Sequence, residues 1–153
     1  MKRIKKIGVI LAILGSIVLC INWFYNKLFT TPIDLKPSEI GKIFIAVELT
    51  STEEPLRGGA TVTDNDNLKD VVNILNNIKV FKKGKYSLYD LEGESPTAWI
   101  HIYNKAGEVI DTIDIYYDIL AYKVKYYKIS MSEYNSLMEI CQKYGEIIPS
   151  SVG

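Results

Sequence analysis

The sequence contains few of the residues on which disulfide scaffolds and metal sites depend. It has two cysteines and one histidine among 153 residues. Two cysteines are too few for a fold built on disulfides, and one histidine cannot build a histidine-based metal site. The chain also has no excess of basic residues, because 18 Lys and Arg balance 18 Asp and Glu. We therefore expect neither a disulfide-built domain nor a nucleic-acid-binding protein.

The charges are nevertheless divided unevenly along the chain. No acidic residue precedes Asp34, and the basic residues of that segment give it a formal charge of +5, which leaves −5 for the rest. With 48% hydrophobic residues the chain is too apolar to be disordered. Its length allows one compact domain and one appended segment.

One long uncharged run lies near the N-terminus, from Ile7 to Ile21, and continues through Trp23 to Tyr25. As a helix, this stretch would be about 28 Å long, close to the ~30 Å hydrocarbon thickness of a bilayer. Several basic residues precede the run and only Lys27 closely follows it. The positive-inside rule then predicts a single-pass protein of the cytoplasmic membrane, with its N-terminus inside and its domain outside.

Three interpretations of residues 1–26 stay open. A cleaved secretory signal would need small residues after the apolar run, where this chain has bulky aromatic residues. A lipoprotein signal would need a small residue before its cysteine, whereas Leu19 precedes Cys20. An uncleaved signal anchor, which also forms the transmembrane helix, is the interpretation we prefer.

Small residues recur at every fourth position of the apolar run and form one stripe on a helix. Such a stripe allows two transmembrane backbones to approach closely. The alternative is that signal anchors are generally rich in small residues. The candidate helix-association face consists of Gly8, Ala12, Ser16 and Cys20.

Beyond an expected linker at residues 27–38, residues 39–149 predict an extracytoplasmic α+β domain. Alternating or periodic apolar residues predict its elements. The N-cap residue Asp64 begins one helix, and Ser130 with Glu133 forms a capping box at the start of the other. We expect an antiparallel sheet of about four to six strands with two helices packed on one face. The expected strands are 43–49, 60–63, 98–103, 109–116, 119–123 and 126–129, and the expected helices begin near residues 64 and 130.

Residues 79–97 show no clear period and are predicted to form a long irregular loop. Basic and aromatic residues cluster in its first half, where they could contact anionic lipid or a wall polymer. A solvated loop is the simpler interpretation. The candidate interaction loop contains Lys82, Lys83, Lys85, Tyr86 and Tyr89.

The sequence offers no pattern of residues that predicts catalysis. His101 shares a strand face with Trp99, and Asp111 and Asp114 lie an odd number of residues apart, so they should point to opposite faces of a strand. Cys141 falls on the apolar face of a helix, where a buried thiol is the ordinary role. We predict no catalytic, metal-binding or cofactor-binding residue, no cofactor, and no enzymatic activity.

The segment KYYKISMSEYNSLMEI, from Lys125 to Ile140, resembles the strand-then-helix ending of several domain-of-unknown-function families. The layout of a basic start, one apolar helix and a small α+β domain is similar to that of uncharacterised membrane-anchored proteins of low-GC Gram-positive bacteria. The resemblance rests on layout and transfers no functional residue.

These observations favour a membrane-anchored domain that binds another protein or an envelope component without catalysis. An exposed sheet edge or the long loop would supply the contact surface. One alternative is a subunit or sensor of a membrane complex that pairs through its transmembrane helix. Two further alternatives are an immunity protein against an envelope-acting toxin and an enzyme.

Overall fold

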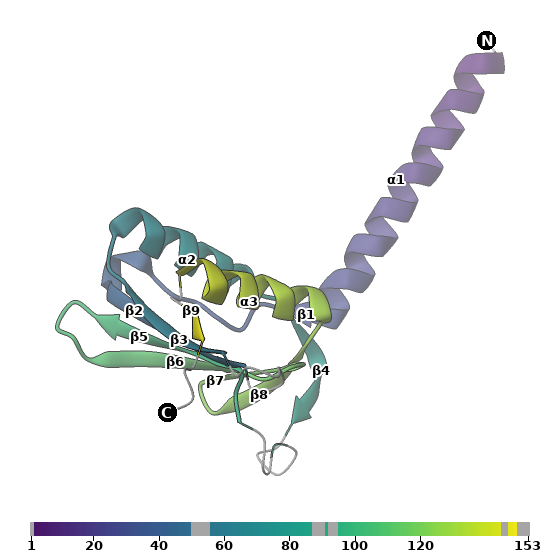
Figure 1. The fold of residues 1–153 in the computed structure, drawn as a ribbon. Coiled ribbons are helices and arrows are strands. Elements are labelled where there is room, and N and C mark those ends of the chain that lie inside the picture. Colours follow the sequence, from purple (N-terminus) through teal and green to yellow (C-terminus); the bar gives the residue numbers. More distant parts are fainter. Residues whose placement is uncertain (1, 50–55, 87–90, 92–94, 145–146, 150–153) are drawn as a thin grey trace.

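A computed structural model describes residues 2–49, 56–86, 91, 95–144 and 147–149. A long helix, α1 (Lys2–Leu28), projects from a domain in which a curved sheet carries two helices on one face (Figure 1). These helices are α2 (Asn65–Asn77) and α3 (Met131–Tyr144). The α+β class and the placement of two helices on one face of the sheet are therefore confirmed.

Among the described residues the sheet is open and antiparallel, with nine strands in the order β1-β4-β8-β7-β6-β5-β2-β3-β9. The expected range of about four to six strands was too low, because three strands were missed: β1, β4 and β9. The strands are β1 (Phe29–Thr30), β2 (Ile40–Leu49), β3 (Leu56–Val62), β4 (Val80–Tyr86), β5 (Ala98–Asn104), β6 (Val109–Ile115), β7 (Ile119–Tyr122), β8 (Lys125–Ile129) and β9 (Ile147–Pro149).

Strand β4 corrects the prediction of a long irregular loop over residues 79–97. Val80 is fully buried and pairs with Ile129 of β8, while Lys85 pairs with Tyr127 farther along the same ladder. The register shifts between these two pairs. Three lysines interrupt the apolar alternation of this segment, so its strand is determined by the neighbour β8 rather than by its own pattern.

The core lies between the sheet and the two helices. Along β2 the side chains of Ile43, Ile45 and Val47 are buried against them, as the alternation of the sequence predicts. The predicted N-cap is also present, because the Asp64 carboxylate accepts hydrogen bonds from the backbone of the first helical turn. Helix α3 begins similarly, with the N–H of Glu133 donating to Ser130 Oγ at 3.3 Å.

The segment expected to be a linker, residues 27–38, is packed into the domain instead. It contains the end of α1, strand β1 and two buried side chains, Ile33 and Leu35, which are 3% and 6% exposed. The backbone N–H of Leu35 donates to Asn76 Oδ1 at 2.8 Å, and Asn76 Nδ2 donates to the Leu35 carbonyl at 2.8 Å. This pair of hydrogen bonds fixes the segment against α2.

We predict that Asn76→Ala destabilises the domain by about 1–3 kcal/mol, because it removes both hydrogen bonds and leaves two backbone groups of Leu35 without their partner. Thermal unfolding of the full chain in detergent, followed by circular dichroism, measures the effect. Asn135→Ala, at an exposed position of α3, is the matched control. An equal loss of stability in both variants would contradict the role given to Asn76.

The two-residue turn between β7 and β8 has an unfavourable backbone conformation. Lys123 and Val124 have φ angles of 49° and 61°, a region that β-branched residues rarely adopt. Val124 is 97% exposed, so packing of its side chain does not compensate for the strain. Tight hairpins ordinarily place Asn or Gly at such positions.

Replacing Val124 by Gly should therefore raise the unfolding free energy by about 1 kcal/mol, because glycine adopts this conformation without steric cost. Chemical unfolding of the full chain in detergent would show a higher midpoint with an unchanged slope. Val124→Ala is the control, since it keeps a Cβ at the same position. A lower midpoint for the glycine variant would show that the turn is not strained.

Candidate functional site

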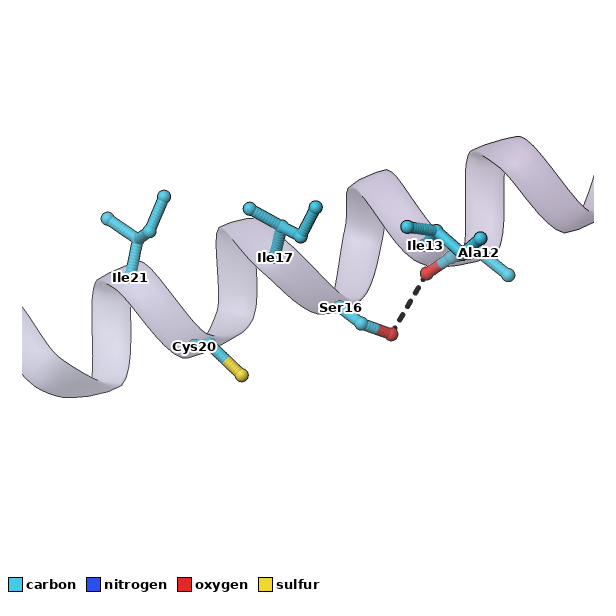
Figure 2. Close-up of a pocket in the computed structure, with 6 residues that line it drawn as sticks. All are labelled: Ala12, Ile13, Ser16, Ile17, Cys20 and Ile21. Atoms are coloured by element: carbon cyan, nitrogen blue, oxygen red, sulfur yellow. Dashed lines mark hydrogen bonds between the residues drawn. The ribbon is translucent and has the colours of Figure 1, made fainter.

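The predicted helix-association face lies on the part of the molecule that no other element covers. Ala12, Ser16 and Cys20 follow one another along one side of α1 and line a shallow groove with neighbouring isoleucines (Figure 2). Gly8 precedes them in the same helix. The Ser16 hydroxyl donates to the carbonyl of Ala12 at 2.9 Å, so its polar group is satisfied within the helix.

Helix α1 also has the length and composition of a membrane span. The stretch Ile10–Leu28 contains 19 residues, and none of its most apolar window is buried in the structure. Leu11, Ile13 and Val18 are each more than half exposed. In water such a surface is unfavourable, because burial of a leucine or isoleucine side chain is worth about 1.5–3 kcal/mol.

The candidate interaction loop is not a loop. Lys82, Lys83, Lys85 and Tyr86 belong to strand β4, and Tyr89 lies outside the described residues. Lys82 has a specific partner in the structure, because its Nζ donates to the backbone carbonyl of Asn26 at 2.7 Å. Of the five predicted residues, Lys82 is the one whose side chain the structure describes.

The sheet surface opposite α2 and α3, here called the open face, is a candidate site that the sequence did not predict. It has no helix on it among the described residues (Figure 1), and its side chains are mostly half-buried. They come from strands β2, β5 and β6, which are neighbours in the sheet. The open face contains Lys42, Phe44, Ala46, Glu48, Trp99, His101, Tyr103 and Asp114.

A hollow of about 440 Å³ lies at one end of the open face, beside Trp99. Ala46 pairs with Trp99 on one side and with Gly59 on the other. Small residues in these positions leave space between the large rings of Phe44 and Trp99, which also line the hollow. A Cβ at Gly59 would lie 3.1 Å from the ring of Phe44, so any larger residue there would displace the ring.

Asp114 is one of two carboxylates on the open face, the other being Glu48 beside the hollow, and it pairs with Trp99 across the β5–β6 ladder. Burial raises its pKa above the ordinary value of 3.8, and the charge of His101 opposes that effect in part. The His101 ring lies 6.2 Å from the ring of Phe44. The open face therefore combines aromatic surface with a carboxylate whose ionisation the fold disfavours.

Asp111 lies on the other side of the sheet from Asp114, as their odd spacing predicted. It pairs with Ile102, whose side chain is buried against the helices. The Asp111 carboxylate accepts a hydrogen bond from the Tyr122 hydroxyl at 2.9 Å and lies 3.4 Å from Lys123 Nζ. The two carboxylates therefore do not meet in one site.

Neither cysteine forms a disulfide, and Cys141 is buried as predicted. Burial raises the pKa of its thiol to about 12, whereas a reactive cysteine needs a lowered pKa. Within the described ranges no group of three or more His, Cys, Asp and Glu residues is placed to hold a metal ion.

The comparisons with known proteins do not assign a family: no family model, no curated protein and no solved structure matches this chain. The open face and the surroundings of α1 are therefore interpreted from their own geometry.

Asp114→Asn should stabilise the protein at neutral pH. Because its pKa is raised in the folded state, the folded chain binds this proton more tightly than the unfolded chain, and the ionised carboxylate lowers stability above that pKa. The difference between variant and wild type should shrink as the pH falls through the raised pKa toward 3.8. Thermal unfolding at a series of pH values measures it.

Asp34→Asn removes an exposed carboxylate and is the matched control. A stabilisation by Asp114→Asn that is the same at every pH would contradict the electrostatic explanation.

The Cys141 thiol should resist alkylation by iodoacetamide at pH 8 in the folded chain and react on unfolding, because it is buried and its pKa is about 12. Mass spectrometry of the Cys20→Ser variant isolates this reaction. Modification of Cys141 in the native protein at the rate of an exposed thiol would show that the site is accessible.

Proposed function

We propose that the protein is a membrane-anchored binding protein whose open face contacts another protein or an envelope component. The observation that carries this proposal is the half-buried carboxylate of Asp114 beside Trp99 and the hollow next to it. A carboxylate that costs stability, on an aromatic surface, is typical of a site kept for recognition rather than for folding.

The composition of the open face supports binding of a macromolecule. Trp and Tyr are enriched at interface positions that contribute most to affinity, and Trp99 and Tyr103 lie on the same strand face. The carboxylate of Asp114 would receive a cationic or hydrogen-bonding group of the partner. No catalytic step is proposed.

The sheet edges, expected from the sequence as a possible contact surface, have short terminal strands. The terminal strands β1 and β9 have two and three residues and cover only part of β4 and β3, so each edge offers an interrupted ladder for strand addition. The open face, rather than an edge, is therefore the contact surface we propose.

For the location of the protein we propose a single-pass anchor in the cytoplasmic membrane, retained as a signal anchor, with the N-terminus inside and the domain outside. The length of the apolar stretch Ile10–Leu28 supports the span, and the basic residues before it support the orientation. The envelope of a Gram-positive bacterium would be the setting, in line with the layout of the chain.

Photo-crosslinking in native membranes tests the binding surface. A benzoylphenylalanine placed at Tyr103 should form one discrete adduct, and Trp99→Ala in the same chain should reduce it at least tenfold, because a buried interface tryptophan is commonly worth 2 kcal/mol or more. The matched probe position is Tyr117, which is 61% exposed and contacts Tyr134 of α3.

No adduct at Tyr103, or equal adducts at Tyr103 and Tyr117, would show that the open face is not the contact surface.

A second candidate function, a membrane-complex subunit that pairs through α1, is favoured by the uncovered groove along Ala12, Ser16 and Cys20. Ala12→Leu with Ser16→Leu should then abolish the complex in detergent while the domain keeps its unfolding temperature, because bulky side chains separate the two backbones. Ile13→Leu with Ile17→Leu is the matched control. An unchanged complex in the first variant would contradict pairing through α1, and the open face would then be the remaining proposal.

A further inference from the structure

A second hollow, here called the juxtamembrane pocket, lies where α1 meets the sheet. It has a volume of about 350 Å³, and its polar lining comes from the last turns of α1, from β1 and the residue after it, and from the start of β4. The polar residues that line it are Tyr25, Asn26, Thr30, Thr31, Lys79 and Lys82.

The groups around this pocket are mostly hydrogen-bond donors. Two lysines, Lys79 and Lys82, line it together with Thr30 and Thr31. Lys82 uses one N–H on the carbonyl of Asn26, and an ammonium group carries three donors. One carboxylate, Glu133, lies near enough to Lys79 to favour its charged form, so two lysines and one carboxylate leave a net positive charge.

Lys79 is positioned by an aromatic contact, whereas Lys82 is positioned by its hydrogen bond to the Asn26 carbonyl. Lys79 Nζ lies 4.9 Å from the centre of the Tyr25 ring, and hydrogen bonding to Tyr25 raises the pKa of Lys79 above its ordinary value. Tyr25 stacks on Phe29, which stacks on Phe81, with ring centres 4.8 and 4.7 Å apart. The side chains of Lys79, Tyr25 and Phe29 are therefore held in place by contacts within the protein.

The membrane anchor proposed above, on which this inference rests, would place the pocket at the level of the bilayer surface. The apolar stretch of α1 ends at Leu28, and Trp23 with Lys27 over its ring at 4.8 Å forms an aromatic and basic girdle just before it. Aromatic rings and lysines of this kind sit at the headgroup layer. Lys79 and Lys82 are distant from α1 in the sequence. The pairing of β1 with β4 brings them beside the end of that helix.

We propose that the juxtamembrane pocket binds the phosphate of an anionic phospholipid headgroup, held by Lys79 and Lys82 and by the hydroxyls of Thr30 and Thr31. A headgroup is favoured over a soluble anion because Tyr25 and Asn26 of the apolar helix α1 line the pocket, so that in the proposed anchor it would open at the headgroup layer. Lysines near an anionic membrane surface contribute favourably to such binding.

This site would hold the domain in one orientation on the lipid surface. It uses none of the residues of the open face and is independent of the partner proposed there.

Native mass spectrometry of the full chain in detergent tests the proposal, with phosphatidylglycerol and phosphatidylcholine titrated separately. The wild type should bind phosphatidylglycerol at least tenfold more tightly. Lys79→Gln with Lys82→Gln should weaken that binding about 25-fold, since each lysine contributes about fivefold, whereas Lys79→Arg with Lys82→Arg should keep most of it.

Lys105→Gln with Lys125→Gln removes the same charge from two exposed positions and is the matched control. The single variant Lys82→Gln, expected to lose about fivefold, serves if the double variant does not fold by circular dichroism.

Equal binding of the two lipids, or an equal loss in the control, would overturn the proposal. Binding of inorganic phosphate to the lipid-free chain that depends on Lys79 and Lys82 would identify a soluble anion as the ligand and would overturn it as well. The photo-crosslink from Tyr103 should persist in the lysine variants, so failure of this site and failure of the open face can be told apart.

Discussion

The arrangement of the molecule depends on the joint between an apolar helix and the edge of a sheet. Helix α1 ends at Leu28, and the next two residues already form β1. The Lys82 ammonium caps the carbonyl of Asn26, which is a favourable place for a cation because helix C-termini carry partial negative charge. The aromatic stack from Tyr25 to Phe81 packs the same junction. Helix α1 is therefore joined to the sheet without an intervening linker.

The two faces of the sheet differ in composition, and the helices α2 and α3 cover only one of them (Figure 1). The covered face buries branched aliphatic residues such as Ile45 and Ile100, which provide the hydrophobic stabilisation of the domain. The open face instead keeps aromatic rings and Asp114 at its surface. A face that contributed only to stability would gain from replacing that carboxylate, and this is the physical argument for the recognition function that we propose.

Local periodicity in the sequence was enough to predict part of the fold. Helix α2 and the β5–β6 hairpin follow from apolar patterns and from turn residues that lie close together in the chain. Strand β4 was missed because its lysines hide the alternation, and the buried Ile33 and Leu35 were missed because Asn76, their anchor, is distant in the sequence.

The candidate sites were harder to predict for the same reason. The row that joins Gly59, Ala46, Trp99 and Asp114 crosses four strands, and the order of strands in a sheet is not a local property. The juxtamembrane pocket likewise depends on pairing between β1 and β4. The sequence indicated that basic and aromatic residues near Lys82 mattered, but not that they would meet the end of α1.

The direct junction at residues 26–30 has a mechanical consequence for the membrane anchor that we propose. An apolar helix adjusts to a thinner bilayer by changing its tilt. With β1 continuing directly from α1 and paired to β4, the sheet of such an anchored protein would turn together with the helix. The orientation of Trp99 and its neighbours relative to the membrane would then depend on the local thickness of the bilayer.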